Sequence, residues 1–253
     1  AKTADKSYVG SVKLNAIYKD LGMSTADKKA KIYVNGDEAL SGNYEVSKSN
    51  DQKLSSISNK IGDGTLVEVY RDDDNNHVDI IAISVYGGKI ADVKAATSKK
   101  DAYVTVDEST IAPDDFNNEY ETEAFEEDDV VAYTYSDTAE EIKSMYKLES
   151  VTGELTKRVV GKNLTLGDTT YKYAKAYGFE SGLEEDDLSN KSEYTVYLDA
   201  NGYALYIEEA SFSSDAYALV EKITADSGSS WDENKAKLLF SDGSEKTVNL
   251  DKD

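Results

Sequence analysis

The sequence predicts an all-β protein with minor helix, built from small β-barrel or sandwich-like modules in an elongated tandem array. A hairpin-like pattern of alternating apolar and polar residues occurs three times. Its corresponding tyrosines, Tyr70, Tyr135 and Tyr197, are separated by 65 and 62 residues, and a fixed period is typical of repeated modules. Strand-type alternation also fills most of the remaining chain, and turn-forming dipeptides separate its apolar runs.

Each hairpin consists of two runs rich in Tyr, Val, Ile and Leu around a polar turn, and these residue types favour strands. The same pattern predicts strands on both sides of the hairpins, and residues 51–61 are expected to include a short helix. The expected strands are 31–34, 66–72, 78–86, 89–93, 102–106, 130–135, 142–148, 151–160, 164–166, 170–174, 194–198, 203–208, 218–223, 237–240 and 246–250.

Five dipeptides tolerate the positive φ angles of tight turns. They are Asn35-Gly36, Asp63-Gly64, Gly87-Gly88, Asn201-Gly202 and Asp242-Gly243. Together with the hairpin period, they divide the chain into expected modules at 1–86, 87–150 and 151–210. Residues 211–253 hold a partial module, or else strands that complete the third.

The charge balance excludes some partners. With 28 basic and 50 acidic residues the formal net charge is −22, and such a field repels nucleic acid and anionic lipid surfaces. No apolar run approaches the roughly 20 residues of a membrane helix, so no membrane insertion is expected. The chain begins with Ala1 and shows no signal-peptide pattern, so we expect an excised or processed piece of a longer protein.

The sequence offers little for catalysis. Cysteine is absent, which excludes thiol chemistry. The single histidine, His77, stands in the turn of the first hairpin, and no nucleophile-elbow motif accompanies it. We therefore expect no enzyme activity and no catalytic residues. An enzyme with an unrecognised site remains open, and it would need a deep polar cleft with a perturbed pair of titratable groups.

Acidic clusters are candidate calcium sites. The run that begins at Asp72 lacks the Gly and the bidentate Glu of an EF-hand loop, because His77 and Ile83 stand at the sixth and twelfth places. A looser site would relieve the repulsion among clustered carboxylates, whereas the alternative is a solvated acidic loop. No other cofactor is expected. The candidate calcium ligands are Asp72, Asp74, Glu126, Asp128, Glu184 and Asp186.

Trp231 is the single tryptophan and lies in a Gly-Ser-Ser-Trp-Asp loop. It is the best candidate for a ligand-contact residue, because exposed aromatic rings stack on sugars and anchor protein partners. The alternative is that it packs against the last partial module. Most of the 19 tyrosines, in contrast, alternate with aliphatic residues in predicted strands, where aromatic side chains pack across strands.

Several segments together resemble a known group of proteins. These are 151–155 (VTGEL), 163–167 (NLTLG), 170–173 (TYKY) and 194–203 (YTVYLDANGY). They resemble repeat segments beside S-layer homology domains in cell-surface proteins of Gram-positive bacteria. The resemblance is best over 151–209, fair over 87–150 and loose before residue 87. It implies an extracellular, cell-wall location, and no S-layer homology domain lies in the chain itself.

The expected function is that of a non-catalytic structural or spacer segment in a bacterial, S-layer-associated surface protein. Its partners would be the neighbouring modules of the same chain, while other domains of the parent protein would contact a cell-wall polymer or a host surface. The alternative is an extracellular binding module, either an adhesin or a carbohydrate binder, that calcium stabilises.

Overall fold

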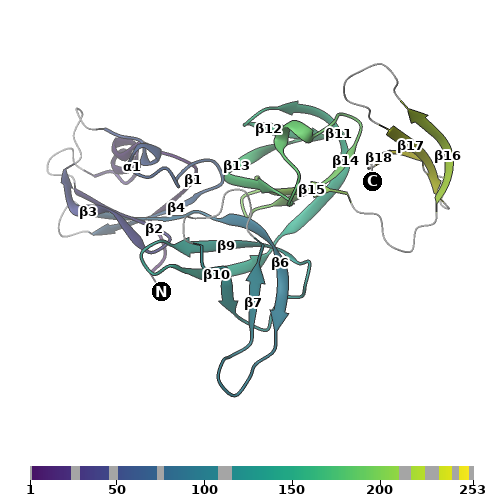
Figure 1. Cartoon of the computed structure of the whole chain (residues 1–253). Coiled ribbons are helices and arrows are strands. Elements are labelled where there is room, and N and C mark those ends of the chain that lie inside the picture. The colour runs from purple at the N-terminus through teal and green to yellow at the C-terminus, as the bar shows by residue number, and fades with distance from the viewer. Residues whose placement is uncertain are drawn as a thin grey trace.

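A computed structural model describes residues 2–23, 29–45, 51–72, 77–107, 116–210, 218–225, 234–240 and 245–250. Strands dominate these residues, and they form four separate sheets (Figure 1). The predicted all-β class with small barrel-like modules is confirmed. None of the helices among the described residues has the length and apolar character needed to cross a membrane.

Module 1 is an open five-stranded sheet with two short helices. The sheet order is β1-β4-β5-β2-β3, and β2 is parallel to β5. Helix α1 was not among the predicted elements, although its buried Leu14, Ile17 and Tyr18 follow the i, i+3, i+4 spacing of a helix that packs on a core. The elements are β1 (Lys6–Val9), α1 (Leu14–Asp20), β2 (Lys29–Val34), β3 (Asp37–Glu45), α2 (Leu54–Ile57), β4 (Leu66–Asp72) and β5 (His77–Ile83).

Module 2 has the sheet order β10-β9-β6-β7-β8. Its first three strands are consecutive antiparallel neighbours, and the fourth returns to lie beside the first, which is a Greek key. Ile90, Val104 and Tyr133 lie at the centre of its core. The strands are β6 (Tyr86–Lys94), β7 (Tyr103–Val106), β8 (Glu119–Glu121), β9 (Val130–Ser136) and β10 (Glu141–Lys147).

Module 3 repeats this Greek key and closes it into a five-stranded barrel in the order β11-β12-β13-β15-β14. The parallel pair β13–β15 completes the closure. Leu155, Val196 and Ile207 are fully buried inside the barrel. Its elements are β11 (Glu149–Val159), β12 (Asn163–Leu166), β13 (Thr169–Phe179), the 3₁₀ turn η1 (Glu185–Asp187), β14 (Glu193–Leu198) and β15 (Ala204–Glu209).

The fourth sheet is an antiparallel meander of three strands in the order β16-β17-β18. These strands are β16 (Ala218–Ala225), β17 (Asn234–Phe240) and β18 (Glu245–Leu250).

Most of the predicted turns fall where expected. Asn35 and Gly36 have φ angles of +52° and +94° and join β2 to β3, and Gly64 and Gly202 also have positive φ. The prediction of a turn at Gly87-Gly88 is wrong, because both residues lie inside β6. The predicted turn at Asp242-Gly243 lies outside the described residues.

Close packing explains the two glycines in β6. A Cβ atom on Gly87 would lie 3.1 Å from the carbonyl oxygen of Leu205, and one on Gly88 would lie 2.5 Å from Cγ1 of Val106. The missing side chains therefore let β15 of module 3 and β7 of module 2 approach the backbone of β6.

Modules 1, 2 and 3 contact one another pairwise. In Figure 1 the purple, blue-to-teal and green modules meet near β6 and β13. Strand β6 contacts both β13 and β15. The side-chain amide of Asn201 in module 3 also donates to the carbonyl oxygen of Gly64 in module 1, so packing adds a direct contact between modules 1 and 3.

Candidate functional site: the junction of modules 1, 2 and 3

Asn35 connects module 1 to module 2 from the tip of the β2–β3 turn. Its side-chain amide donates to the carbonyl oxygens of Ser84 at 2.9 Å and Tyr135 at 3.2 Å, and the backbone N–H of Ser84 donates to Asn35 Oδ1 at 2.9 Å. Asn35 is only 8% exposed and Ser84 only 3%. A buried amide with all of these bonds satisfied fixes the turn against both partners.

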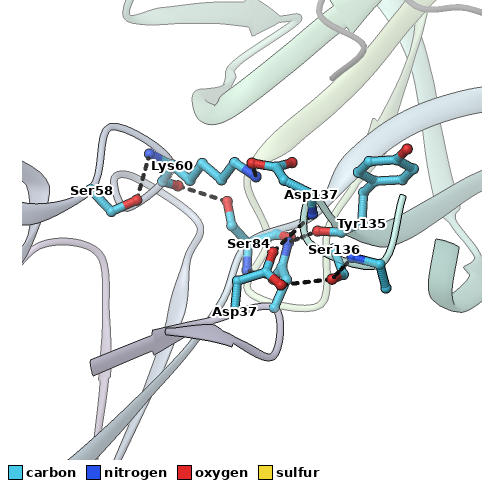
Figure 2. Close-up of polar contacts among 9 residues, drawn as sticks. Asp37, Ser58, Lys60, Ser84, Tyr135, Ser136 and Asp137 are labelled. Atoms are coloured by element: carbon cyan, nitrogen blue, oxygen red, sulfur yellow. Dashed lines mark hydrogen bonds and ion pairs between the residues drawn. The ribbon is translucent and has the colours of Figure 1, made fainter. Parts of the chain in front are cut away.

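The carboxylate of Asp37 accepts hydrogen bonds from the tip of the β9–β10 hairpin, as Figure 2 shows. The hydroxyl of Ser136 donates to Asp37 Oδ1 at 2.7 Å, and the backbone N–H of Asp137 donates to Oδ2 at 2.8 Å. Burial alone would raise the pKa of Asp37, but these hydrogen bonds, together with those from Thr138, outweigh it and lower the pKa below its ordinary value. The carboxylate is therefore a charged acceptor shared between two modules.

Lys60 adds a second polar contact between the same two modules. Its Nζ lies 2.5 Å from Asp137 Oδ2, and its carbonyl oxygen accepts from the hydroxyl of Ser84 at 2.7 Å (Figure 2). Ser84 stands between β5 and β6, so this contact holds the connection between the modules as well as the hairpin tip.

The loop before β4 connects module 1 to module 3. The backbone N–H of Lys175 donates to the carbonyl oxygen of Asp63 at 2.7 Å, and the side-chain amide of Asn201 donates to that of Gly64 at 2.9 Å. Gly64 has a φ of +82°, and a Cβ atom there would lie 2.4 Å from Asp199 Oδ2. Glycine is required at this position both by its backbone conformation and by the close approach of module 3.

Asp199 lies at the centre of the contact between modules 1 and 3 and is 5% exposed. Its Oδ1 accepts from the backbone N–H groups of Asn201 at 2.8 Å and Tyr203 at 2.9 Å. Its Oδ2 is buried beside Gly64 and has no hydrogen-bond partner among the described residues. Burial raises the pKa of Asp199 and outweighs the lowering effect of the backbone donors.

Modules 2 and 3 share an apolar cluster and an ion pair between a half-buried lysine and a buried carboxylate. Lys89 Nζ lies 3.1 Å from Glu208 Oε2, and the hydroxyl of Tyr197 donates to Glu208 Oε1 at 2.6 Å. The side chain of Glu208 is only 10% exposed, so the lysine offsets the cost of burying its charge. The apolar cluster consists of Val130, Ala132, Leu148, Ala174, Leu205 and Tyr206.

The candidate calcium ligands of the first two clusters take part in local structure. Asp72 is exposed at the end of β4, opposite His77 across the hairpin, and Asp74 lies outside the described residues. The backbone N–H of Glu126 donates to Asp129 Oδ2 at 3.1 Å in the turn before β9. Asp128 in that turn has a φ of +69° and lies 3.9 Å from Lys89 Nζ.

The third acidic cluster forms the 3₁₀ turn η1. The backbone N–H of Glu184 donates to Asp187 Oδ2 at 2.9 Å in a capping box, and the exposed Asp186 lies 3.9 Å from Arg158 Nη2. Across the described residues, no three His, Cys, Asp or Glu side chains gather closely enough to hold a metal ion. Trp231, the candidate contact residue, lies outside the described residues.

The junction residues were not singled out in the sequence as functional. Three of them occur in turn dipeptides that the sequence did identify, at Asn35, Gly64 and Asn201. The sequence feature that could have identified them is the turn itself, because Asn side chains and the positive φ angles of Gly and Asn suit tight contacts. Which module each turn contacts depends on packing between segments up to 137 residues apart.

Comparison with known proteins identifies no relative of this chain. No family model matches the chain, and neither a curated protein nor a solved structure does.

Proposed function

We propose that this chain is a non-catalytic spacer segment of an extracellular, S-layer-associated protein of the bacterial cell wall. The observation that supports it best is the junction, in which each of three modules is bonded to the other two. Two modules joined by one connection can pivot about it. A third contact closes a triangle and removes that freedom, which is a useful property in a spacer.

Charge and sequence pattern support the proposed location. The net charge of −22 favours a hydrated surface that does not self-associate at high local concentration. The resemblance to repeat segments of S-layer-associated proteins points to the same setting. The proposed partners are neighbouring modules of the same chain, and other domains of the parent protein would contact a wall polymer or a host surface.

Paired spin labels test the rigidity that a spacer requires. The sequence contains no cysteine, so exposed positions can be labelled selectively as Lys19→Cys, Lys99→Cys and Asp168→Cys in modules 1, 2 and 3. Pulsed electron resonance on each pair should give one narrow distance distribution. Broad distributions in the otherwise unaltered chain would contradict the proposal, since modules that reorient freely cannot hold a fixed spacing.

A binding module is the second candidate, and one hollow favours it. Strands β7, β8 and β10 line a surface hollow of about 430 Å³ that includes Tyr103 and Tyr120. Lys100 Nζ lies 3.5 Å from the ring centroid of Tyr103 and 2.6 Å from Glu119 Oε2. Aromatic rings beside charged groups suit a carbohydrate.

A glycan and protein array screen separates the two candidates. Saturable binding that is lost in Tyr103→Ala, or in Trp231→Ala for the loop candidate, would replace the spacer role by a binding role. Binding no higher than background for all ligands would leave the spacer proposal in place.

Calcium stabilisation is part of this second candidate. A cation that binds only the folded chain raises its unfolding temperature. Thermal unfolding should therefore shift upward with millimolar calcium if the acidic clusters bind it, and identical midpoints with calcium and with a chelator would refute the idea.

A further inference from the structure

The fourth sheet repeats a local irregularity of modules 2 and 3. In each, one extra residue on the first strand interrupts its pairing with the second strand, which defines a β-bulge. The extra residues are Ala91 in β6, Thr156 in β11 and Glu221 in β16. They are spaced 65 residues apart, so β16, β17 and β18 correspond to the first three strands of the Greek key.

Burial differs at the residue before the bulge. Ile90 and Leu155 are 0% exposed and lie in the cores of modules 2 and 3, whereas the corresponding Val220 is 52% exposed. Their neighbours across the ladder are apolar in all three cases, namely Val106, Leu166 and Leu238. Val220 thus occupies the position that is a buried core residue in modules 2 and 3, but in the fourth sheet its side chain is exposed.

The covering in modules 2 and 3 comes from a hairpin. Val131 and Tyr133 of β9 share a core with Ile90, and Val196 and Ile207 of β14 and β15 share one with Leu155. The first strand of each hairpin also pairs antiparallel with β6 or β11. The same interface between a hairpin and a bulged strand therefore already occurs twice in the chain. In both cases the first hairpin strand is antiparallel to the bulged strand.

Among the described residues, β16 pairs with β17 alone. Three of its apolar side chains, Leu219, Val220 and Ile223, are 67%, 52% and 64% exposed. Val220 and Ile223 pair with Leu238 and Ala236, which are two residues apart on β17, so they share one face of the sheet. Leu219 pairs with Leu239 and lies on the other face. Exposed apolar side chains on a strand with an unpaired edge mark a surface that binds another strand.

We propose that the fourth sheet is the acceptor for a β-hairpin homologous to β9–β10 and β14–β15, carried by a polypeptide segment outside residues 1–253. The hairpin adds a strand antiparallel to β16 and covers Val220 with alternating Val, Tyr and Ile side chains, a form of β-strand addition. The acceptor does not depend on the spacer role, because it follows from the repeat in β6, β11 and β16 alone.

The experiment extends the chain after Asp253 with a flexible linker and a copy of residues 130–147 or of residues 193–209. Amide hydrogen exchange is measured in 218–225 and 234–240. Exchange should slow by at least about tenfold when the hairpin docks. The matched control carries Asp at the two copied core positions of each hairpin, which correspond to Val131 and Tyr133 or to Val196 and Ile207, and it should give no protection.

A second variant tests the acceptor side. Val220→Asp in the extended chain should abolish the protection, and because Val220 is exposed it should leave modules 1, 2 and 3 folded. Equal exchange with both hairpin copies and with their controls would overturn the proposal. A dimeric unextended chain with 218–225 already protected would also overturn it, since a second copy would then be the occupant.

Discussion

Asn35 and Ser84 exchange two hydrogen bonds, each 2.9 Å long, as two paired residues of adjacent strands do. Here the side-chain amide of Asn35 provides the donor and the acceptor that the backbone of one strand would otherwise provide. The pair lies where module 1 passes into module 2, and the same amide also reaches Tyr135. A single side chain therefore fixes the connection and the hairpin beyond it.

Replacing Asn35 by Gly removes these bonds and keeps the positive φ of the turn. We expect a loss of about 2–4 kcal/mol in the free energy of unfolding, because buried backbone groups of Ser84 and Tyr135 lose their hydrogen bonds to Asn35. Chemical denaturation measures it. The matched control is Asp168→Gly, in the exposed two-residue turn between β12 and β13, which should change stability by less than about 0.5 kcal/mol. Equal effects of the two variants would show that the amide contributes nothing at the junction.

Gly64→Ala should destabilise the contact between modules 1 and 3. The new Cβ would lie 2.4 Å from Asp199 Oδ2, and the φ of +82° adds backbone strain. Gly182→Ala is the control, because Gly182 has a φ of +87° and nothing within 4 Å of its Cβ position. The control should cost about 1–2 kcal/mol and Gly64→Ala clearly more. Broader label distances between modules 1 and 3 should accompany only the Gly64 variant.

Lys89→Met should cost about 2–4 kcal/mol, because it leaves the buried carboxylate of Glu208 without its cation. Adding Glu208→Gln should restore part of that loss, so the two changes are not additive. The exposed pair Lys100–Glu119 provides the comparison, since its side chains are 42% and 44% exposed. Lys100→Met should cost much less than Lys89→Met, because solvent screens an exposed pair. A fully additive double-mutant cycle at Lys89 and Glu208 would contradict the structural interpretation.

Asp199 should make the junction sensitive to pH. Because burial raises its pKa, the folded chain binds this proton more tightly than the unfolded chain, so its contribution to stability falls as the pH rises from the ordinary value of 3.8 through the folded pKa. Asp199→Asn removes the titration. The stability of this variant relative to the parent chain should therefore increase with pH across that window and stay constant above it. A difference that does not vary with pH would refute the assignment.

The hairpins and most other strands could be predicted because alternation is a local property of the chain. Short or edge elements gave weaker patterns, and β1, β3 and β8 were not predicted. Gly87-Gly88 was predicted as a turn but lies inside a strand, where the two glycines allow neighbouring strands to approach closely. The contacts of Asn35 and Asp199 could not be predicted, because they join turns whose partners are set by how whole modules pack.

The bond from Asn201 to Gly64 spans 137 residues. During synthesis, the loop of module 1 that carries Gly64 is therefore made long before the turn that covers it. Module 1 has its own core and can fold early, but its final contact forms only after nearly all of module 3 has left the ribosome. Truncated chains that end before Asn201 would expose this surface, which makes the order of assembly directional from the N-terminus.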